Sequence, residues 1–163
     1  VGSKHLHVGA QGAVLEEECR SMPPGPLPHF FLVNIQLPVE PPSLLQSPAS
    51  RSMSAVFYFR VRPEAQTAAT NLATADPALR LLVAYCKDAP SRRDLQEKLK
   101  IVFNLDNPSE SGVPAMFKQI NGTPSMIRNT GTLFTGPGYI EMDIDIGGCS
   151  RMHRSALHQM QGQ

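Results

Sequence analysis

The sequence predicts an α+β domain with a mainly antiparallel sheet of about five or six strands, two or three helices and long proline-rich loops. Three observations lead to this class. Short apolar or alternating segments, typical of strands, follow one another near both ends of the chain. A segment with helical spacing of its apolar residues lies between them. The 15 prolines and 12 glycines, with no tryptophan, indicate many loops, while 163 residues with 41% hydrophobic side chains suit one domain.

The first half of the chain contains two predicted strands. Residues 1–28 are weakly patterned and end in a proline-rich run that disfavours helix and strand pairing. A strand is expected over Phe30–Leu37, whose continuously apolar start is typical of a strand buried on both faces. Residues 38–53 contain four prolines and are expected to form a long loop. The second strand, Ser54–Arg62, alternates between two faces, one of them rich in phenylalanine.

After the second strand, the pattern changes to that of a helix. Asp76 can cap the N-terminus of this helix, Pro77 suits its first position, and apolar residues then recur at helical spacing. Ser91 and Asp94 are spaced as a capping box and predict a second, short helix that ends near residue 98. The alternation that follows predicts a strand over residues 99–105.

Two turns organise the last third of the chain. Asn121-Gly122 lies between segments 113–120 and 125–130, and this arrangement predicts a hairpin. Gly136-Pro137-Gly138 predicts a turn into a last strand over Tyr139–Ile146. Strands that are adjacent in sequence at both ends of the chain favour antiparallel pairing.

Charge and hydropathy exclude several classes of function. The formal net charge is +1, so no global field attracts nucleic acid or an anionic membrane surface. Arg60 and Arg62 share a predicted strand face with Tyr58, but we expect a solvated face there and no nucleic-acid partner. No apolar run approaches the ~20 residues that span a bilayer, so we do not expect the chain to be transmembrane.

The start of the chain and its cysteines bear on processing and compartment. The chain begins with Val1 rather than methionine, and nothing at its start resembles a signal peptide, so we expect a processed form or a fragment. The three cysteines are odd in number and far apart in sequence: Cys19, Cys86 and Cys149. This spacing favours a reducing compartment over a disulfide framework.

The last predicted strand carries the sharpest candidate for chemistry. Glu141, Asp143 and Asp145 project from one face at intervals of about 7 Å, which could hold a hard cation or serve acid–base catalysis. A solvated strand face opposite a buried one is the commoner arrangement, and we expect it here. The histidines are not spaced as metal ligands, and Cys149 has no matched base. The residues therefore predict no catalytic residue, cofactor site or metal site.

Several stretches of the chain resemble a known family, and two of them carry its clearest motifs. Pro28–Pro38 is similar to the opening Pro-x-Phe-x-Leu-Val-Asn-Leu-Gln-Val-Pro strand of the plant Enhanced Disease Resistance 2 C-terminal family. The second stretch resembles that family's Gly-Pro-x-Tyr-x-Glu-x-Asp-x-Asp-Ile-Gly signature at Gly136, Pro137, Tyr139, Glu141, Asp143, Asp145 and Gly147. The resemblance covers about residues 23–150. We therefore expect the family-like domain over residues 29–150, between a proline-rich segment (1–28) and a polar tail (151–163).

The resemblance implies a domain of unknown biochemistry, found in plants, algae and some protists, that follows lipid-binding modules on endomembrane-associated proteins in land plants. We therefore expect a non-catalytic binding module that contacts a lipid or a membrane-associated protein at a peripheral membrane or in an organelle. The family's long apolar helix after the signature has no counterpart in the polar residues 151–163, so we expect exposed apolar surface on the sheet.

Two alternatives from other classes are kept. The first is an accessory subunit of a larger assembly, such as an organellar membrane complex, with the proline-rich segments 20–28 and 38–53 wrapped over partner proteins. The second is an enzyme that acts through Asp143 and Asp145, for which the sequence suggests no reaction.

Overall fold

The structure is a computed structural model, and it describes residues 10–39, 52–102, 104, 106–107, 118, 121–127 and 130–148. Its elements are, in chain order, α1 (Ala10–Ser21), β1 (Phe30–Pro38), β2 (Ser52–Arg60), α2 (Pro63–Ala69), α3 (Pro77–Asp88), η2 (Ala89–Ser91), α4 (Arg93–Gln96), β3 (Lys100–Val102), β4 (Pro124–Met126), β5 (Gly131–Gly136), β6 (Tyr139–Asp145) and η3 (Ile146–Gly148). The predicted α+β class is confirmed. The described residues contain four α-helices, three of them seven residues or longer, where two or three helices were expected.

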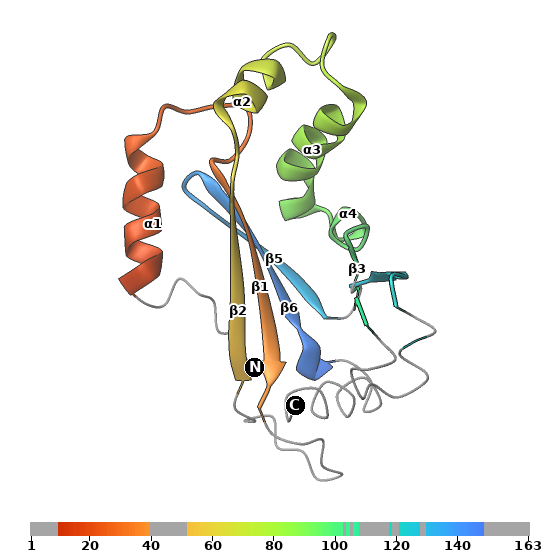
Figure 1. The fold of residues 1–163 in the computed structure, drawn as a ribbon. Coiled ribbons are helices and arrows are strands. Elements are labelled where there is room, and N and C mark those ends of the chain that lie inside the picture. The colour runs from red at the N-terminus through yellow and green to blue at the C-terminus, as the bar shows by residue number, and fades with distance from the viewer. Residues whose placement is uncertain are drawn as a thin grey trace. The chain divides into compact units, whose positions relative to one another are not determined.

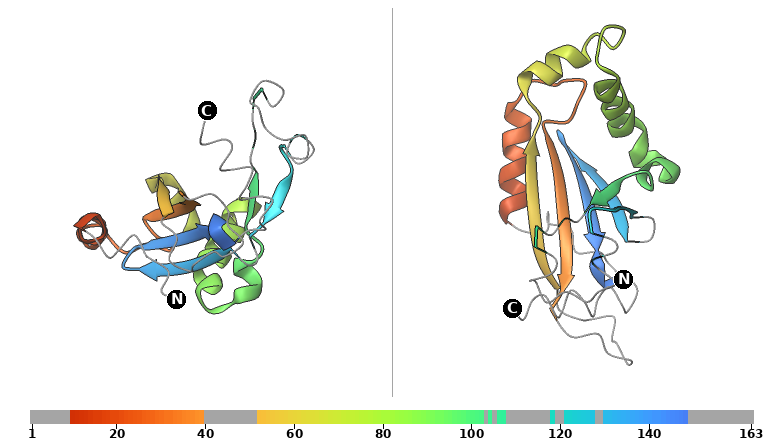
Figure 2. Two further views of the ribbon diagram at one scale, coloured as in Figure 1. Left: turned by 90° about the horizontal axis from the view of Figure 1, so that it is seen from below. Right: turned by 45° about the vertical axis from the view of Figure 1, so that its right-hand side comes forward.

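Four strands form the main sheet, in the order β2-β1-β6-β5 (Figures 1 and 2). The central pair is parallel, because His29 N, just before β1, donates to Gly138 O, just before β6, at 2.6 Å. The outer pairs are antiparallel: Val61 N donates to His29 O at 2.8 Å, and Asp145 N donates to Thr130 O at 2.7 Å. Strands adjacent in sequence thus pair as expected. The sheet is nevertheless mixed, since two strands from opposite ends of the chain lie side by side in parallel.

A separate two-stranded sheet contains β3 and β4. These strands are antiparallel, with Lys100 opposite Met126 and Val102 opposite Pro124. Gly122 has φ = +70°, which fits the predicted tight turn. Strand β4 pairs with β3, and most of the expected hairpin partner, segment 113–120, lies outside the described residues, so the hairpin stays a prediction.

The chain forms two compact units. The first comprises Val1–Asn34, Val56–Gln96 and Thr132–Asp143, and it contains all four described α-helices together with much of the main sheet. The second comprises Ile35–Ala55, Glu97–Gly131 and Ile144–Gln163, and it contains β3 and β4.

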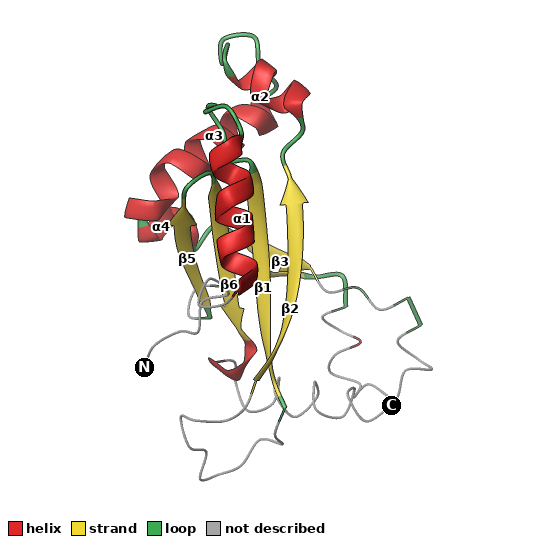
Figure 3. Cartoon of the chain, turned by 90° about the vertical axis from the view of Figure 1, so that its left-hand side faces the viewer, coloured by secondary structure: helices red, strands yellow, loops and turns green. Residues whose placement is uncertain are grey.

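Helix α1 lies along one face of the main sheet (Figure 3). No helix was predicted within residues 1–28. Leu15 and Cys19, four residues apart and therefore on one side of the helix, are buried against Phe30, Leu32 and Tyr139. This contact is narrow, and most of the other described α1 side chains are exposed. The apolar pattern of α1 is consequently too weak to be recognised in the sequence.

Strand β1 is buried more on one face than on the other. Phe30, Leu32 and Asn34 are buried, whereas Phe31 and Val33 are only partly buried. The expected burial of both faces is therefore wrong for the start of this strand. The face of β1 that includes Phe30 and Leu32 is the face that α1 covers.

Helices α2 and α3 form a second core, which includes Leu27, Ala69 and Val83. The predicted start of α3 is confirmed, since Asp76 Oδ1 accepts a hydrogen bond from Ala78 N at 2.7 Å. Pro63 begins α2, an element that the sequence analysis did not predict, and this helix is only seven residues long.

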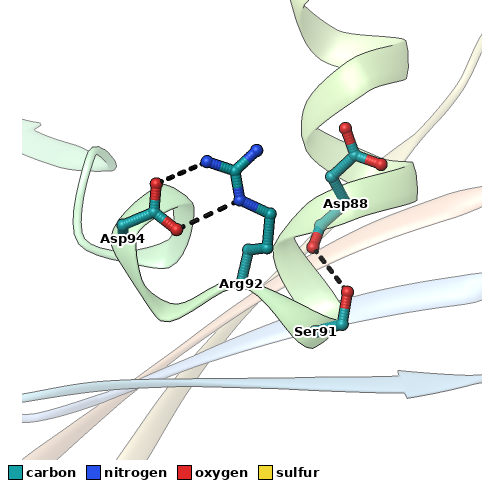
Figure 4. A network of polar contacts seen from close by, with 4 residues as sticks. All are labelled: Asp88, Ser91, Arg92 and Asp94. Atoms are coloured by element: carbon teal, nitrogen blue, oxygen red, sulfur yellow. Dashed lines mark hydrogen bonds and ion pairs between the residues drawn. The ribbon is translucent and has the colours of Figure 1, made fainter.

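The predicted capping box at Ser91 is wrong (Figure 4). Ser91 Oγ donates to Asp88 O at 3.1 Å, so it is bonded to the preceding helix rather than to the next one. The carbonyl of Arg92 accepts the first hydrogen bond of α4, from Leu95 N at 3.0 Å. The Asp94 carboxylate accepts two bonds from the Arg92 guanidinium, at 3.2 and 2.7 Å. The N-cap of the short helix is therefore Arg92, one residue later than the capping box indicated.

Candidate functional site

The signature residues begin at the tight Gly136-Pro137-Gly138 turn, which joins β5 to β6. Gly138 has φ = +77°, a conformation that glycine adopts at little cost. A Cβ at this position would lie 2.9 Å from the Cβ of Cys19 and 3.0 Å from Cδ2 of His29. A Cβ at Gly136 would collide with the ring of Tyr139, which is buried. Both glycines therefore allow the turn to pack closely against its neighbours.

The acidic side chains of β6 are less solvated than the sequence suggested. Glu141 is 0% exposed and Asp143 is 3% exposed, while Asp145 is exposed. The expectation of a solvated acidic face is thus wrong for the first two residues. Asp143 Oδ1 accepts a hydrogen bond from Nδ2 of Asn34 on the parallel strand β1, at 3.1 Å, and Asn34 is 1% exposed. This buried contact joins the first and last strands of the sheet through their side chains.

The end of the signature stabilises the end of β6. Asp145 Oδ1 accepts from Gly147 N at 2.7 Å, and a Cβ at Gly147 would come within 2.8 Å of the same oxygen. Among the described residues, no three His, Cys, Asp or Glu side chains gather closely enough to hold a metal ion. The hydrogen bonds described for Asp143 and Asp145 join parts of the domain to one another.

Two tyrosines lie within the electrostatic reach of Glu141. Burial raises the pKa of Tyr58, and the negative charge of Glu141 raises it further. Burial also raises the pKa of Tyr139, with smaller effects from Glu16, Glu141 and Cys19. Both phenols therefore remain protonated at neutral pH and can serve as hydrogen-bond donors rather than as bases.

The two cysteines in the described part of the chain are free thiols. Burial is the main cause of a raised pKa at Cys19, and the charges of Glu18 and Glu16 add to it. Burial raises the pKa of Cys86 to about 11. Neither thiol is therefore activated as a nucleophile. Cys149 lies outside the described residues.

Two open pockets lie on the proline-rich segment between α1 and β1. The first, which we call the α2 pocket, has a volume of about 390 Å³ and is lined by residues 22–26, His29, the end of β2 and helix α2. The second, the turn pocket, has a volume of about 470 Å³ and is lined by the same segment together with Cys19, Cys86 and the Gly136-Pro137-Gly138 turn. Both volumes fall in the range of small-molecule sites, roughly 300–1,000 Å³.

Gln66 of α2 fixes the proline-rich segment in place. Its Oε1 accepts from Leu27 N at 3.1 Å, and its Nε2 donates to Leu27 O at 2.9 Å and to Pro28 O at 3.3 Å. Leu27 is buried between α2 and α3. Gly25 lies so close to Gln66 that a Cβ there would be 2.5 Å from its Oε1. Sequence reasoning missed Gln66, because a single glutamine on a short helix carries no recognisable signal.

The remaining candidates from the sequence are placed as follows. Tyr58, Arg60 and Arg62 are exposed at and just beyond the end of β2, as the predicted solvated face requires. The terminal histidines lie outside the described residues: His5, His7, His153 and His158. No helix in the described part of the chain is long and apolar enough to cross a membrane.

The fold and the signature define a class: an α+β domain whose last strand carries acidic residues at alternate positions beside a parallel first strand. The chain belongs to the family described as "Protein ENHANCED DISEASE RESISTANCE 2, C-terminal", whose profile matches residues 3–163. The match is longer than the 23–150 expected from the motifs, and it includes the polar C-terminal residues. No curated protein and no solved structure matches the chain.

Proposed function

We propose that this protein is a non-catalytic binding module that contacts a lipid or a membrane-associated protein through the apolar face of strand β2. The observation that carries the proposal is the exposure of two aromatic side chains on this edge strand: Phe57 is 49% exposed and Phe59 is 55% exposed. Large apolar side chains grouped on a surface are typical of interaction sites. Edge strands more often carry charges or short, protected backbone.

The apolar surface continues from β2 onto β1. The hydrogen bond from Val61 N to His29 O sets the register of the two strands and places Phe59 across from Phe31 and Phe57 across from Val33. Phe31 and Val33 are only partly buried, so the four side chains form a half-exposed patch, which we call the β2 patch. Burying the exposed half of each phenylalanine would contribute about 1 kcal/mol to binding.

The apolar side chains of β6 are buried, in contrast to those of the β2 patch. Ile140, Met142 and Ile144 are all buried, so this part of the sheet is not the open surface expected from the sequence. Binding through the sheet is therefore assigned to its β2 edge.

A vesicle assay tests the proposal. We expect the wild-type chain to float with phosphatidylcholine vesicles that contain phosphatidylserine, and the Phe57→Ser, Phe59→Ser double variant to remain in the soluble fraction. Leu81→Ser is the matched control, because Leu81 is an apolar side chain on α3 that is 71% exposed. Native mass spectrometry of the gently purified wild type should detect bound lipid or a bound protein. A bare chain that also ignores vesicles would refute the proposal.

The accessory-subunit alternative receives less support. It relied on the proline-rich segments 20–28 and 38–53 as partner-wrapping arms. The first of these is held to its own α2 by Gln66, and its Leu27 is buried in the domain's own core. Most of the second lies outside the described residues. Isolation of the native chain in a stoichiometric protein complex without lipid would favour this alternative.

A further inference from the structure

The α2 pocket has an uneven chemical character. The prolines of segment 22–26, together with Met22 and Val61, supply apolar wall. The lining also includes Arg60 and His29, and it contains no aspartate or glutamate. An arginine in an apolar lining that contains no acidic residue favours a ligand that carries negative charge.

Most of the other polar groups in the α2 pocket are already bonded. Thr67 Oγ1 donates to Pro63 O at 3.1 Å, and Thr70 Oγ1 donates to Thr67 O at 2.7 Å. The Gln66 amide is bonded to the proline-rich segment. The side chain of Arg60 forms no hydrogen bond or ion pair with any other described residue, so its N–H donors remain available to a ligand.

We propose that the α2 pocket binds a small organic anion, a carboxylate or a phosphate ester attached to a compact apolar body. The Arg60 guanidinium forms paired hydrogen bonds to the anionic group, since its planar array of N–H donors matches the oxygens of a carboxylate and of a phosphate ester. The apolar body lies against the proline-rich segment, which Gln66 holds in place before the ligand arrives. Such preorganisation lowers the cost of binding. This site is distinct from the β2 patch and takes a different ligand.

Amide chemical shifts of the ¹⁵N-labelled 163-residue chain, followed during titration, test the proposal with three probes: benzoate, phenyl phosphate and benzamide. Benzamide has nearly the shape of benzoate but no charge. We expect at least one anion to give saturable shifts at Val61, Gln66 and Thr67, and benzamide to bind roughly tenfold more weakly or not at all. Stronger binding of phenyl phosphate would identify a phosphate ester as the ligand class, and stronger binding of benzoate would identify a carboxylate.

Two variants separate this site from general electrostatics. Arg60→Gln should weaken binding of the anion about tenfold, because one charged hydrogen-bonding contact is lost. Arg80→Gln, which removes an exposed arginine from α3 outside the pocket, should leave affinity unchanged. The Phe57→Ser, Phe59→Ser variant should bind the probes normally, so failure of the β2 patch and failure of this pocket are distinguishable. Equal binding of benzoate and benzamide, equal binding by Arg60→Gln, or no saturable shift at about 10 mM probe would overturn the proposal.

Discussion

Replacement of Asn34 by aspartate is a strong test of the buried contact between the first and last strands. Asn34 Nδ2 lies 3.1 Å from Asp143 Oδ1, and both side chains are almost fully buried. In Asn34→Asp, two ionised carboxylates at that separation would repel each other by about 5 kcal/mol at an effective dielectric constant of ~20. The folded protein will instead keep one carboxyl protonated. Retaining this proton at pH 7, against an ordinary pKa of about 3.9, costs about 4 kcal/mol. We expect the free energy of unfolding to fall by about that amount.

The pH dependence of this variant has a definite sign. The shared site raises the pKa of one carboxyl in the folded state above its value in the unfolded chain. As the pH rises from about 4, the unfolded state loses this proton first, so the variant loses stability relative to wild type with increasing pH. Urea unfolding at several pH values between about 4 and 7 measures the effect.

Two control variants make the Asn34→Asp result interpretable. Asn34→Ala removes the hydrogen bond without adding a charge and should cost about 1.5–3 kcal/mol with little additional dependence on pH. Asp143→Asn keeps an amide-to-amide hydrogen bond and removes the charge, so it should be the milder change at neutral pH. If Asn34→Asp were as stable as wild type at pH 7, or equally destabilised at all pH values, the two side chains would not form a water-excluded pair and the reasoning would be refuted.

Three further predictions concern packing and ionisation. Gly136→Ala should lower the free energy of unfolding by about 1–3 kcal/mol, because its methyl group displaces the buried ring of Tyr139. Gly122→Asn should cost less in the same urea titration, because a Cβ there meets only Asn104 Oδ1 at 3.6 Å and asparagine tolerates the φ of +70° better than most residues. Gln66→Leu should lower the free energy of unfolding by about 1–3 kcal/mol and should speed hydrogen exchange at the Leu27 amide, which loses its acceptor. Unchanged protection of that amide would contradict the role of the glutamine. Burial raises the pKa of Cys86 from 9.0 to about 11, so this thiol should contribute a decline in stability as the pH rises through this interval, where only the unfolded thiol ionises. Cys86→Ala should make the alkaline decline measurably shallower, while the other buried thiol and phenols retain their part of it.

The parts of the fold that could be predicted have strong local signals. A run of apolar residues predicts strand β1, and strict alternation predicts β6. Asp76 and Pro77 predict the start of α3, and the structure contains the capping hydrogen bond to Asp76. Helix α1 and strand β5 were missed for physical reasons. Few described α1 side chains are buried, and β5 begins and ends with glycine, which has low strand propensity. The parallel pairing of β1 with β6 depends on contacts far apart in sequence, which local patterns do not contain.

The candidate sites were predictable to a smaller extent. Alternation along β6 correctly placed its acidic residues on one face, but the same alternation occurs whether that face meets water or protein. Burial of Glu141 and Asp143 therefore could not be inferred from spacing. The pockets depend on how Gln66 holds a proline-rich segment 38 and 39 residues away in sequence, and no local pattern encodes that contact.

The parallel pairing at the centre of the sheet constrains how the chain can be made. Asn34 and Asp143 are 109 residues apart, so strand β1 leaves the ribosome long before its central partner exists. At about 5–20 residues per second, that interval lasts roughly 5–20 s, during which the aromatic β1–β2 pair has an unpaired strand edge. Closing so long a loop also slows the final step of folding. Any chain that ends before Tyr139 lacks the strand that completes the centre of the sheet, and it should aggregate rather than fold into a smaller version of the domain.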